Sequence, residues 1–78
     1  MFDLIPLGSL RAGQRALVEQ VLGQAYQVHR LEELGIRGGA SIEMLQPGSP
    51  CIVQLAGNKL CFRGGETMSI LVRVGAVA

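Results

Sequence analysis

The chain has 78 residues, of which 49% are hydrophobic and 17% are charged, and its formal net charge is +1. A chain of this length folds as one domain with a small core, so a pocket that encloses a substrate is not expected and an enzyme is the least expected class. The 7 lysine and arginine residues are scattered along the chain. This argues against nucleic acid as the main partner, because phosphate binding requires a dense positive surface.

The sequence contains no pattern typical of a signal peptide or a membrane span. Residues 1–10 include Asp3 and no basic residue, and Pro6 and Gly8 interrupt them. The longest charge-free run lies between residues 43 and 59, and several prolines and glycines break it. We therefore expect a cytoplasmic protein without direct membrane insertion, which leaves open that it docks on a membrane protein.

The first predicted strand runs from about Arg15 to Leu22, after a turn around Gly13. Ala16 and Val18 alternate with their neighbours in the period of two that is typical of a strand. The phase of this alternation slips before Val21, which predicts a bulge or a bend.

A helix is predicted from about Gln24 up to Gly35. Its apolar residues recur every three positions, and we expect them to pack on the rest of the fold: Ala25, Val28, Leu31 and Leu34. Gly35 is expected to end the helix in a left-handed conformation, with Ile36 making the hydrophobic contact beyond it. The remaining charged side chains would form an exposed display face: His29, Arg30, Glu33 and Arg37.

The C-terminal half predicts four more strands. Ala40–Gln46 alternates, and residues 51–62 predict a hairpin with Gly57-Asn58 as its two-residue connection. In that register Leu55 faces Leu60 and Val53 faces Phe62, and one set of side chains shares the inner face: Cys51, Val53, Leu55, Leu60 and Phe62. After a turn at residues 63–67, a last strand over residues 68–74 puts three side chains on one face: Ile70, Val72 and Val74. Residues 76–78 are expected to fray.

These elements predict a mainly β fold, a single domain over residues 1–78. Five short strands with one helix between the first and the second favour a small barrel that is closed or nearly closed. The helix would seal an open side of this barrel.

Few residues are candidates for chemistry. Cys51 is expected to point inward and Cys61 outward, so they form neither a disulfide nor a joint metal site, and free cysteines fit a reducing compartment. His29 and Glu33, four positions apart on the helix, and Cys61 are the candidate metal ligands, but they do not make a complete ligand set. No cofactor is predicted.

Some apolar residues are expected to face away from the core. Ile52 and Leu71 point outward if the strand phases hold, and Leu45 is a further case. Exposed apolar residues that gather into one patch mark an interaction surface, whereas isolated ones do not. The sequence leaves both readings open.

The order of these segments resembles the FeoA family, the small ferrous iron transport protein A domain, over roughly residues 6–73. The opening PLGSLRAGQRALVEQV is similar to the family's L-x-x-L-x-x-G-x-x-A-x-V at Leu7, Leu10, Gly13, Ala16 and Val18. The helix exit RLEELGIRGGASIEML is similar to R-L-x-x-L-G-[LI]-x-x-G-x-x-[IV] at Arg30, Leu31, Leu34, Gly35, Ile36, Gly39 and Ile42. The hairpin SPCIVQLAGNKLCFR matches at Pro50, Val53, Gly57, Leu60 and Arg63.

The resemblance implies an SH3-like β-barrel and a cytoplasmic accessory that docks on FeoB, the membrane-embedded ferrous iron transporter with a G domain. It brings no catalytic residues with it, and the chain departs from the family's usual pattern at Cys51 and Cys61. The same domain occurs in iron-dependent repressors, so the alternative is a transition-metal-sensing module that acts through protein contacts. A homodimer, including one that shares a metal between chains, stays open. The expected partner surface consists of His29, Arg30, Glu33, Arg37, Ile52 and Leu71.

Overall fold

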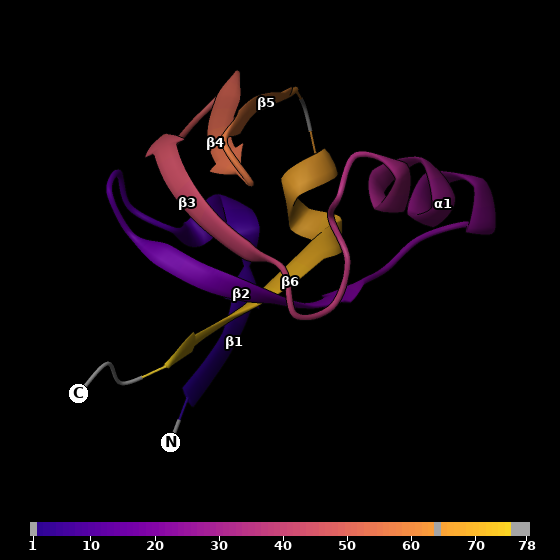
Figure 1. Ribbon diagram of the computed structural model, residues 1–78, viewed down its shortest axis with the longest axis horizontal. Helices are drawn as coiled ribbons and strands as arrows, with labels where there is room; N and C mark the ends of the chain where they lie inside the picture. The colour runs from indigo at the N-terminus through magenta and orange to yellow at the C-terminus, as the bar shows by residue number, and fades with distance from the viewer. Residues whose placement is uncertain (1, 64, 76–78) are drawn as a thin grey trace.

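The computed structural model describes residues 2–63 and 65–75, and its strands form one antiparallel sheet. Six strands lie in the order β1-β6-β2-β3-β4-β5, and the sheet curls so that β1 and β5 are its two ends (Figure 1). The expected fraying of residues 76–78 and part of the predicted turn at residues 63–67 fall outside the described residues. In chain order the elements are β1 (Phe2–Pro6), η1 (Leu7–Ser9), β2 (Arg15–Val21), α1 (Ala25–Glu33), β3 (Ser41–Gln46), β4 (Cys51–Leu55), β5 (Asn58–Phe62), η2 (Glu66–Ser69) and β6 (Ile70–Gly75).

The sheet has six strands rather than the five that the sequence predicted, because the N-terminal strand β1 was missed. It pairs with β6 from the far end of the chain, from Phe2 opposite Gly75 to Pro6 opposite Leu71. A proline is tolerated at the end of an edge strand, where no neighbour needs its missing N–H. The helix therefore follows the second strand, not the first.

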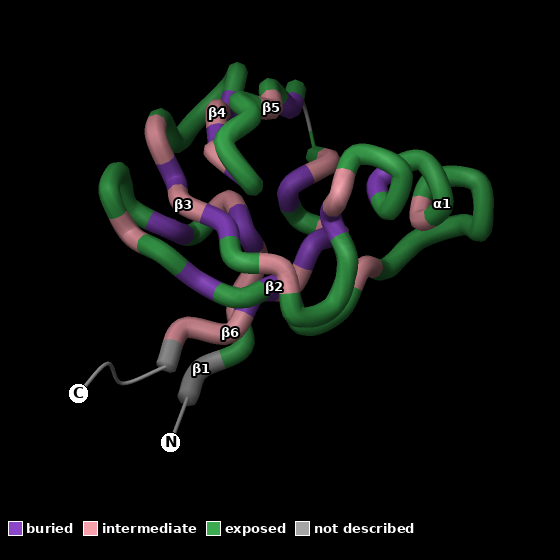
Figure 2. Tube along the Cα trace, viewed as in Figure 1, coloured by how far each residue is buried: buried purple, intermediate pink, exposed green. Residues whose placement is uncertain are grey.

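The core consists mainly of the side chains that the alternation placed inward, and Figure 2 shows buried segments interspersed with more exposed ones along the strands. Ile42 and Met44 of β3 and Ile70 and Val72 of β6 are almost fully buried, which confirms the predicted faces of those strands. Leu7 of η1 is also fully buried. The whole buried cluster consists of Leu7, Leu10, Ala16, Val18, Leu31, Ile36, Ile42, Met44, Cys51, Val53, Leu55, Phe62, Ile70 and Val72.

The predicted bulge in β2 is confirmed. Val18 pairs with Val72 of β6 and Gln20 pairs with Leu71, so Glu19 is the extra residue on the bulged strand. A bulge bends its strand and increases the local twist. The bend comes directly before the chain leaves the sheet to form α1.

The register of the β4–β5 hairpin differs from the predicted one by two residues. Leu55 pairs with Asn58 and Val53 with Leu60, so the connection is Ala56-Gly57 rather than Gly57-Asn58. Both connecting residues have positive φ, 51° and 83°, as a type I′ turn requires. Because side chains alternate with a period of two, a shift of two residues leaves the inner face unchanged, and Phe62 is still buried.

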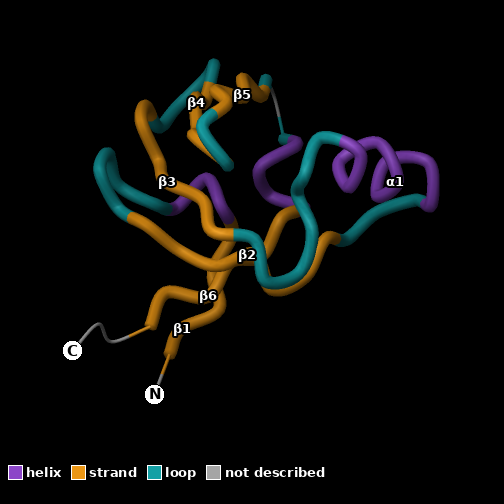
Figure 3. The backbone as a smooth tube through the Cα atoms, viewed as in Figure 1, coloured by secondary structure: helices purple, strands orange, loops and turns teal. Residues whose placement is uncertain are grey.

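Helix α1 does not seal the barrel, which corrects the sequence prediction. Of the expected apolar stripe, Leu31 is 5% exposed, Leu34 is 45% exposed, Val28 is half-buried and Ala25 is exposed. Figure 3 shows α1 standing to one side of the sheet. Residues spaced by three turn steadily around a helix of 3.6 residues per turn, so four of them spread over about 180°. Such a wide arc cannot face one surface along its whole length.

Candidate functional site

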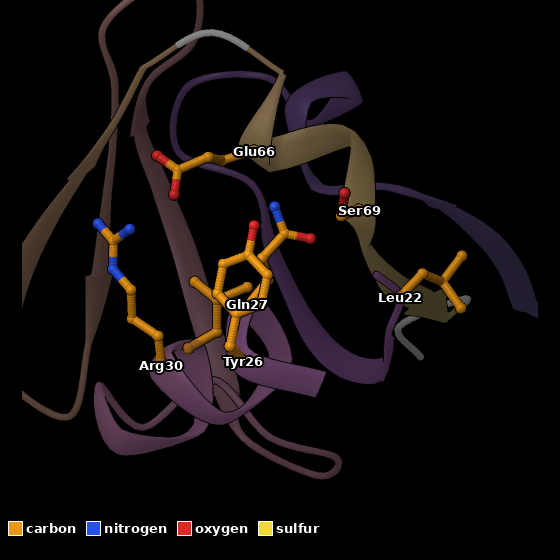
Figure 4. A pocket seen from close by; sticks show the side chains of 7 residues that line it. Leu22, Tyr26, Gln27, Arg30, Glu66 and Ser69 are labelled. Carbon is orange, nitrogen blue, oxygen red and sulfur yellow. The ribbon is translucent and has the colours of Figure 1, made fainter. Parts of the chain in front are cut away.

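A groove with a volume of about 220 Å³ opens between α1 and η2. Figure 4 shows its two walls, with Tyr26, Gln27 and Arg30 rising from the helix and Glu66 and Ser69 coming from η2. We call it the α1–η2 groove. It is lined by Leu22, Tyr26, Gln27, Arg30, Leu31, Glu66 and Ser69.

The N-terminal end of α1 is held by local hydrogen bonds that also set one end of the groove. Gly23 has φ +128°, a conformation that lets the chain turn away from β2. The backbone N–H of Gln24 donates to the side-chain oxygen of Gln27 at 3.2 Å. The N–H of Leu22 donates to the carbonyl of Ser69 at 2.7 Å, which ties the start of the helical segment to η2.

The C-terminal end of α1 is closed by the predicted glycine cap. Gly35 N–H donates to Glu32 C=O and Ile36 N–H donates to Leu31 C=O, both at 2.9 Å. This is the Schellman pattern, in which the hydrophobic contact joins Ile36 and Leu31. Gly35 has φ +98°, and a Cβ on it would lie 2.7 Å from Cδ2 of Leu55. The cap therefore lies directly against β4.

The groove combines an apolar floor with polar and charged walls. Leu31 forms part of the floor, while Tyr26 is 68% exposed and Leu22 is 42% exposed at the rim. Arg30 stands on the helix wall and the half-buried Glu66 on the η2 wall. The volume lies below the roughly 300–1,000 Å³ of typical small-molecule pockets. It suits the insertion of one or two side chains better than a cofactor.

The family model of the FeoA domain matches residues 5–74. The chain belongs to the FeoA domain family. No curated protein sequence matches it significantly.

Solved FeoA structures share the fold of this FeoA domain. The FeoA protein of Chlorobium tepidum is 35% identical with a TM-score of 0.82, and the match covers 92% of this chain and 71% of that chain. The FeoA of Stenotrophomonas maltophilia, solved in complex with zinc, is 27% identical with a TM-score of 0.77, and the match covers 87% of this chain and 88% of that chain. That protein is described as a prokaryotic SH3 domain protein, which supports the predicted SH3-like class.

The fold also occurs in IdeR and in a manganese-dependent transcriptional repressor. T. acidophilum IdeR matches with a TM-score of 0.84 at 19% identity, over 94% of this chain and 35% of that chain. At that level of identity the likeness shows the fold alone.

Within residues 2–63 and 65–75 of this FeoA domain, none of the helices has the length and apolar character needed to span a membrane.

The predicted display face of α1 is exposed, and only one of its members lines the groove. His29 Nε2 lies 3.4 Å from Glu33 Oε2, with side chains that are 73% and 68% exposed. Arg37 Nη2 donates to the carbonyl of Glu32 at 3.0 Å, so this guanidinium satisfies a carbonyl at the helix end. Arg30 alone lies in the groove wall.

The outward apolar pair of the prediction does not form one patch. Ile52 on β4 and Leu71 on β6 are both half-buried, and β2 and β3 lie between their strands in the sheet. Three strand spacings amount to about 14 Å along the sheet. Ile52 is paired with Cys61 on β5. The partner roles of Ile52 and Leu71 stay predictions.

The two cysteines lie on opposite faces, as predicted. Cys51 is buried and Cys61 is exposed, and both are free. The Sγ atom of Cys51 lies 3.6 Å from Sδ of Met44 in the core. Burial raises the pKa of the Cys51 thiol, and the nearby Cys61 raises it further. Within the described residues, no group of three or more His, Cys, Asp and Glu side chains is placed to hold a metal ion.

The sequence reasoning missed most of the groove. Only Tyr26 could have been singled out from the sequence. A large aromatic residue outside the apolar stripe of a helix is either exposed to solvent or packed against another helix or strand. Glu66 and Ser69 carried no such signal, because they come from a turn far along the chain that only the fold brings to α1.

Proposed function

We propose that the protein is a non-enzymatic accessory of ferrous iron uptake that acts in the cytoplasm by docking on the cytoplasmic region of the transporter FeoB and modulating it. The observation that carries this proposal is the FeoA family match over residues 5–74. The relative from Stenotrophomonas maltophilia is proposed to act as a bacterial ferrous iron transport activating factor, which supports the same role.

The position of α1 supports a docking role. The helix contributes one buried residue, Leu31, and its other side chains are exposed or half-buried. A helix whose surface is not needed to cover the core can be covered by a partner instead. Its exposed side carries His29, Arg30 and Glu33, and charges at an interface rim mainly affect encounter rate and specificity.

The test is binding to the purified cytoplasmic region of FeoB. Reversal of Arg30 and Glu33 together, Arg30→Glu with Glu33→Arg, should leave thermal unfolding unchanged and weaken binding, most strongly at low salt. The matched control is Arg11→Glu with Glu19→Arg, which makes the same two reversals at other exposed positions.

The possible outcomes are distinct. Unchanged binding by a folded double variant would mean that the display face lies elsewhere, with Ile52 and Leu71 as the next two separate positions to test. Absence of binding by the wild-type protein to the FeoB region would overturn the docking role.

A metal-sensing role is the second candidate, and the zinc complex of the Stenotrophomonas maltophilia relative is the observation that favours it. We expect the isolated chain to bind Zn²⁺ or Fe²⁺ only weakly, because His29, Glu33 and Cys61 do not form a complete set of ligands. Calorimetry with each ion tests this. Stoichiometric binding at micromolar affinity or tighter, abolished by His29→Ala, would favour the sensing role. Sedimentation with and without Zn²⁺ would reveal a metal shared between two chains.

A further inference from the structure

We infer that the α1–η2 groove receives an apolar side chain from a short partner segment that also carries one acidic and one basic residue. The inference rests on the proposed docking function and names the contact surface and the chemistry of the segment that fits it. It moves the centre of docking from the outer face of α1 to the side of the helix that faces η2.

The groove has the form of an anchor site. Its volume of about 220 Å³ is bounded by apolar atoms of Leu22, Tyr26 and Leu31. Interfaces derive most of their affinity from a few anchors in such pockets, and tyrosine is enriched among them. Tyr26, at 68% exposure, has most of its surface still to bury.

The charges of the groove define the rest of the segment. Arg30 and Glu66 stand on opposite walls, and among the described residues neither of them forms an ion pair. Glu66 is already half-buried, so a docked segment would remove more of its water. A carboxylate that loses water requires a cation in exchange. An acidic side chain would meet Arg30 and a basic one Glu66, whereas a purely apolar segment would leave both unpaired.

The walls are placed by contacts that do not depend on a ligand. The Gln24–Gln27 hydrogen bond and the Leu22–Ser69 hydrogen bond hold one end, and the cap at Gly35 holds the other. A preformed groove reduces the ordering cost of binding.

The experiment measures the Kd of the purified cytoplasmic region of FeoB for the full chain and its variants. Tyr26→Ala should weaken binding by about tenfold or more, as expected for the loss of an aromatic anchor. Ser69→Leu, which fills the groove from the η2 side, should weaken it at least as much. Arg30→Glu and Glu66→Lys should each weaken binding by about 3- to 10-fold at low salt, with a smaller effect at high salt.

Two control variants reproduce the charge changes outside the groove. Arg11→Glu and Glu19→Lys alter net charge in the same way at exposed positions, and they should change Kd by less than about twofold. Thermal unfolding of each variant separates lost binding from lost folding. Because Tyr26 and Arg30 are exposed, their variants should fold even if Ser69→Leu does not.

Four results would overturn the inference. Folded groove variants that bind like wild type would place the docking surface elsewhere and leave the proposed function standing. If the charge changes in the groove and those at the control positions altered Kd equally, the effect would reflect the overall charge of the protein and not a contact in the groove. A wild-type dimer in sedimentation that Tyr26→Ala converts to monomer would show that a second copy occupies the groove. Failure of the wild-type protein to bind the FeoB region would contradict both the inference and the proposed function.

Discussion

The barrel and helix α1 are held in place by different means. The barrel buries side chains from each strand β2 to β6 in one shared cluster, whereas α1 contributes Leu31 alone. The helix is fixed chiefly at its ends, by the hydrogen bond from Leu22 N–H to Ser69 C=O at one and by the Gly35 cap against Leu55 at the other. This difference suggests that the barrel provides stability and that the middle of α1 is left available for contact with a partner.

The largest expected effect would come from the barrel itself. Phe62→Ala removes a side chain that is 3% exposed in the core, and it should cost about 3–5 kcal/mol of unfolding free energy. That is most of the stability expected for so small a domain. Denaturant unfolding measures it, with Lys59→Ala on the exposed side of the same strand as the control. A variant with wild-type stability would mean that the barrel core does not carry the fold.

The single buried residue of α1 should come next. Leu31→Ala should cost about 2–4 kcal/mol, because its side chain is buried against the barrel. Leu34→Ala, at 45% exposure, is the matched control and should cost less than about 1 kcal/mol. Equal costs in denaturant unfolding would show that α1 packs along the whole apolar stripe, as the sequence had suggested.

The cap that joins the two regions can be tested with a pair of glycines. Gly35 and Gly39 have similar positive φ, +98° and +89°, but only at Gly35 would a Cβ meet a neighbour, Leu55. Gly39→Ala should cost about 1 kcal/mol from backbone strain alone. Gly35→Ala should cost about 2–3 kcal/mol, since overpacking adds to the strain. If the two variants melt together, the contact between the cap and β4 is not a constraint on α1.

The smallest effect concerns the buried thiol of the barrel. Burial raises the pKa of Cys51 above its ordinary value of 9.0, so the folded state keeps its proton at a pH where the unfolded chain loses it. The stabilisation is complete below the ordinary pKa and is lost as the pH rises through the folded value. Unfolding midpoints should therefore fall at alkaline pH, and fall less in Cys51→Val, which lacks the titrating group. Parallel pH profiles would contradict the assignment.

Several features followed from local pattern. The alternation in β3 and β6 placed Ile42, Met44, Ile70 and Val72 inward, because side chains on a strand alternate whatever the strand pairs with. The phase slip before Val21 marked the bulge. Gly35 followed by Ile36 predicted the helix cap, since the left-handed conformation favours glycine locally.

Other features depended on contacts between distant segments. β1 exists through its pairing with β6, and no alternation within residues 2–6 announced it. The hairpin register differs by two residues from the predicted one because the turn residues are Ala56-Gly57. Both registers place the same side chains on the inner face, so the hydrophobic pattern could not distinguish them. The family resemblance was readable in the motifs and is confirmed by the domain match.

The sequence alone determined which side chains could share a face, because periodicity along one strand or helix is a local property. Only the tertiary structure decided how far α1 lies from the barrel and that Tyr26 and Arg30 face Glu66 across a groove. The orientation of a nine-residue helix is set by the sum of its contacts at both ends, not by its own pattern. An apolar stripe specifies that a helix must touch something, and the rest of the chain determines which part of the stripe does.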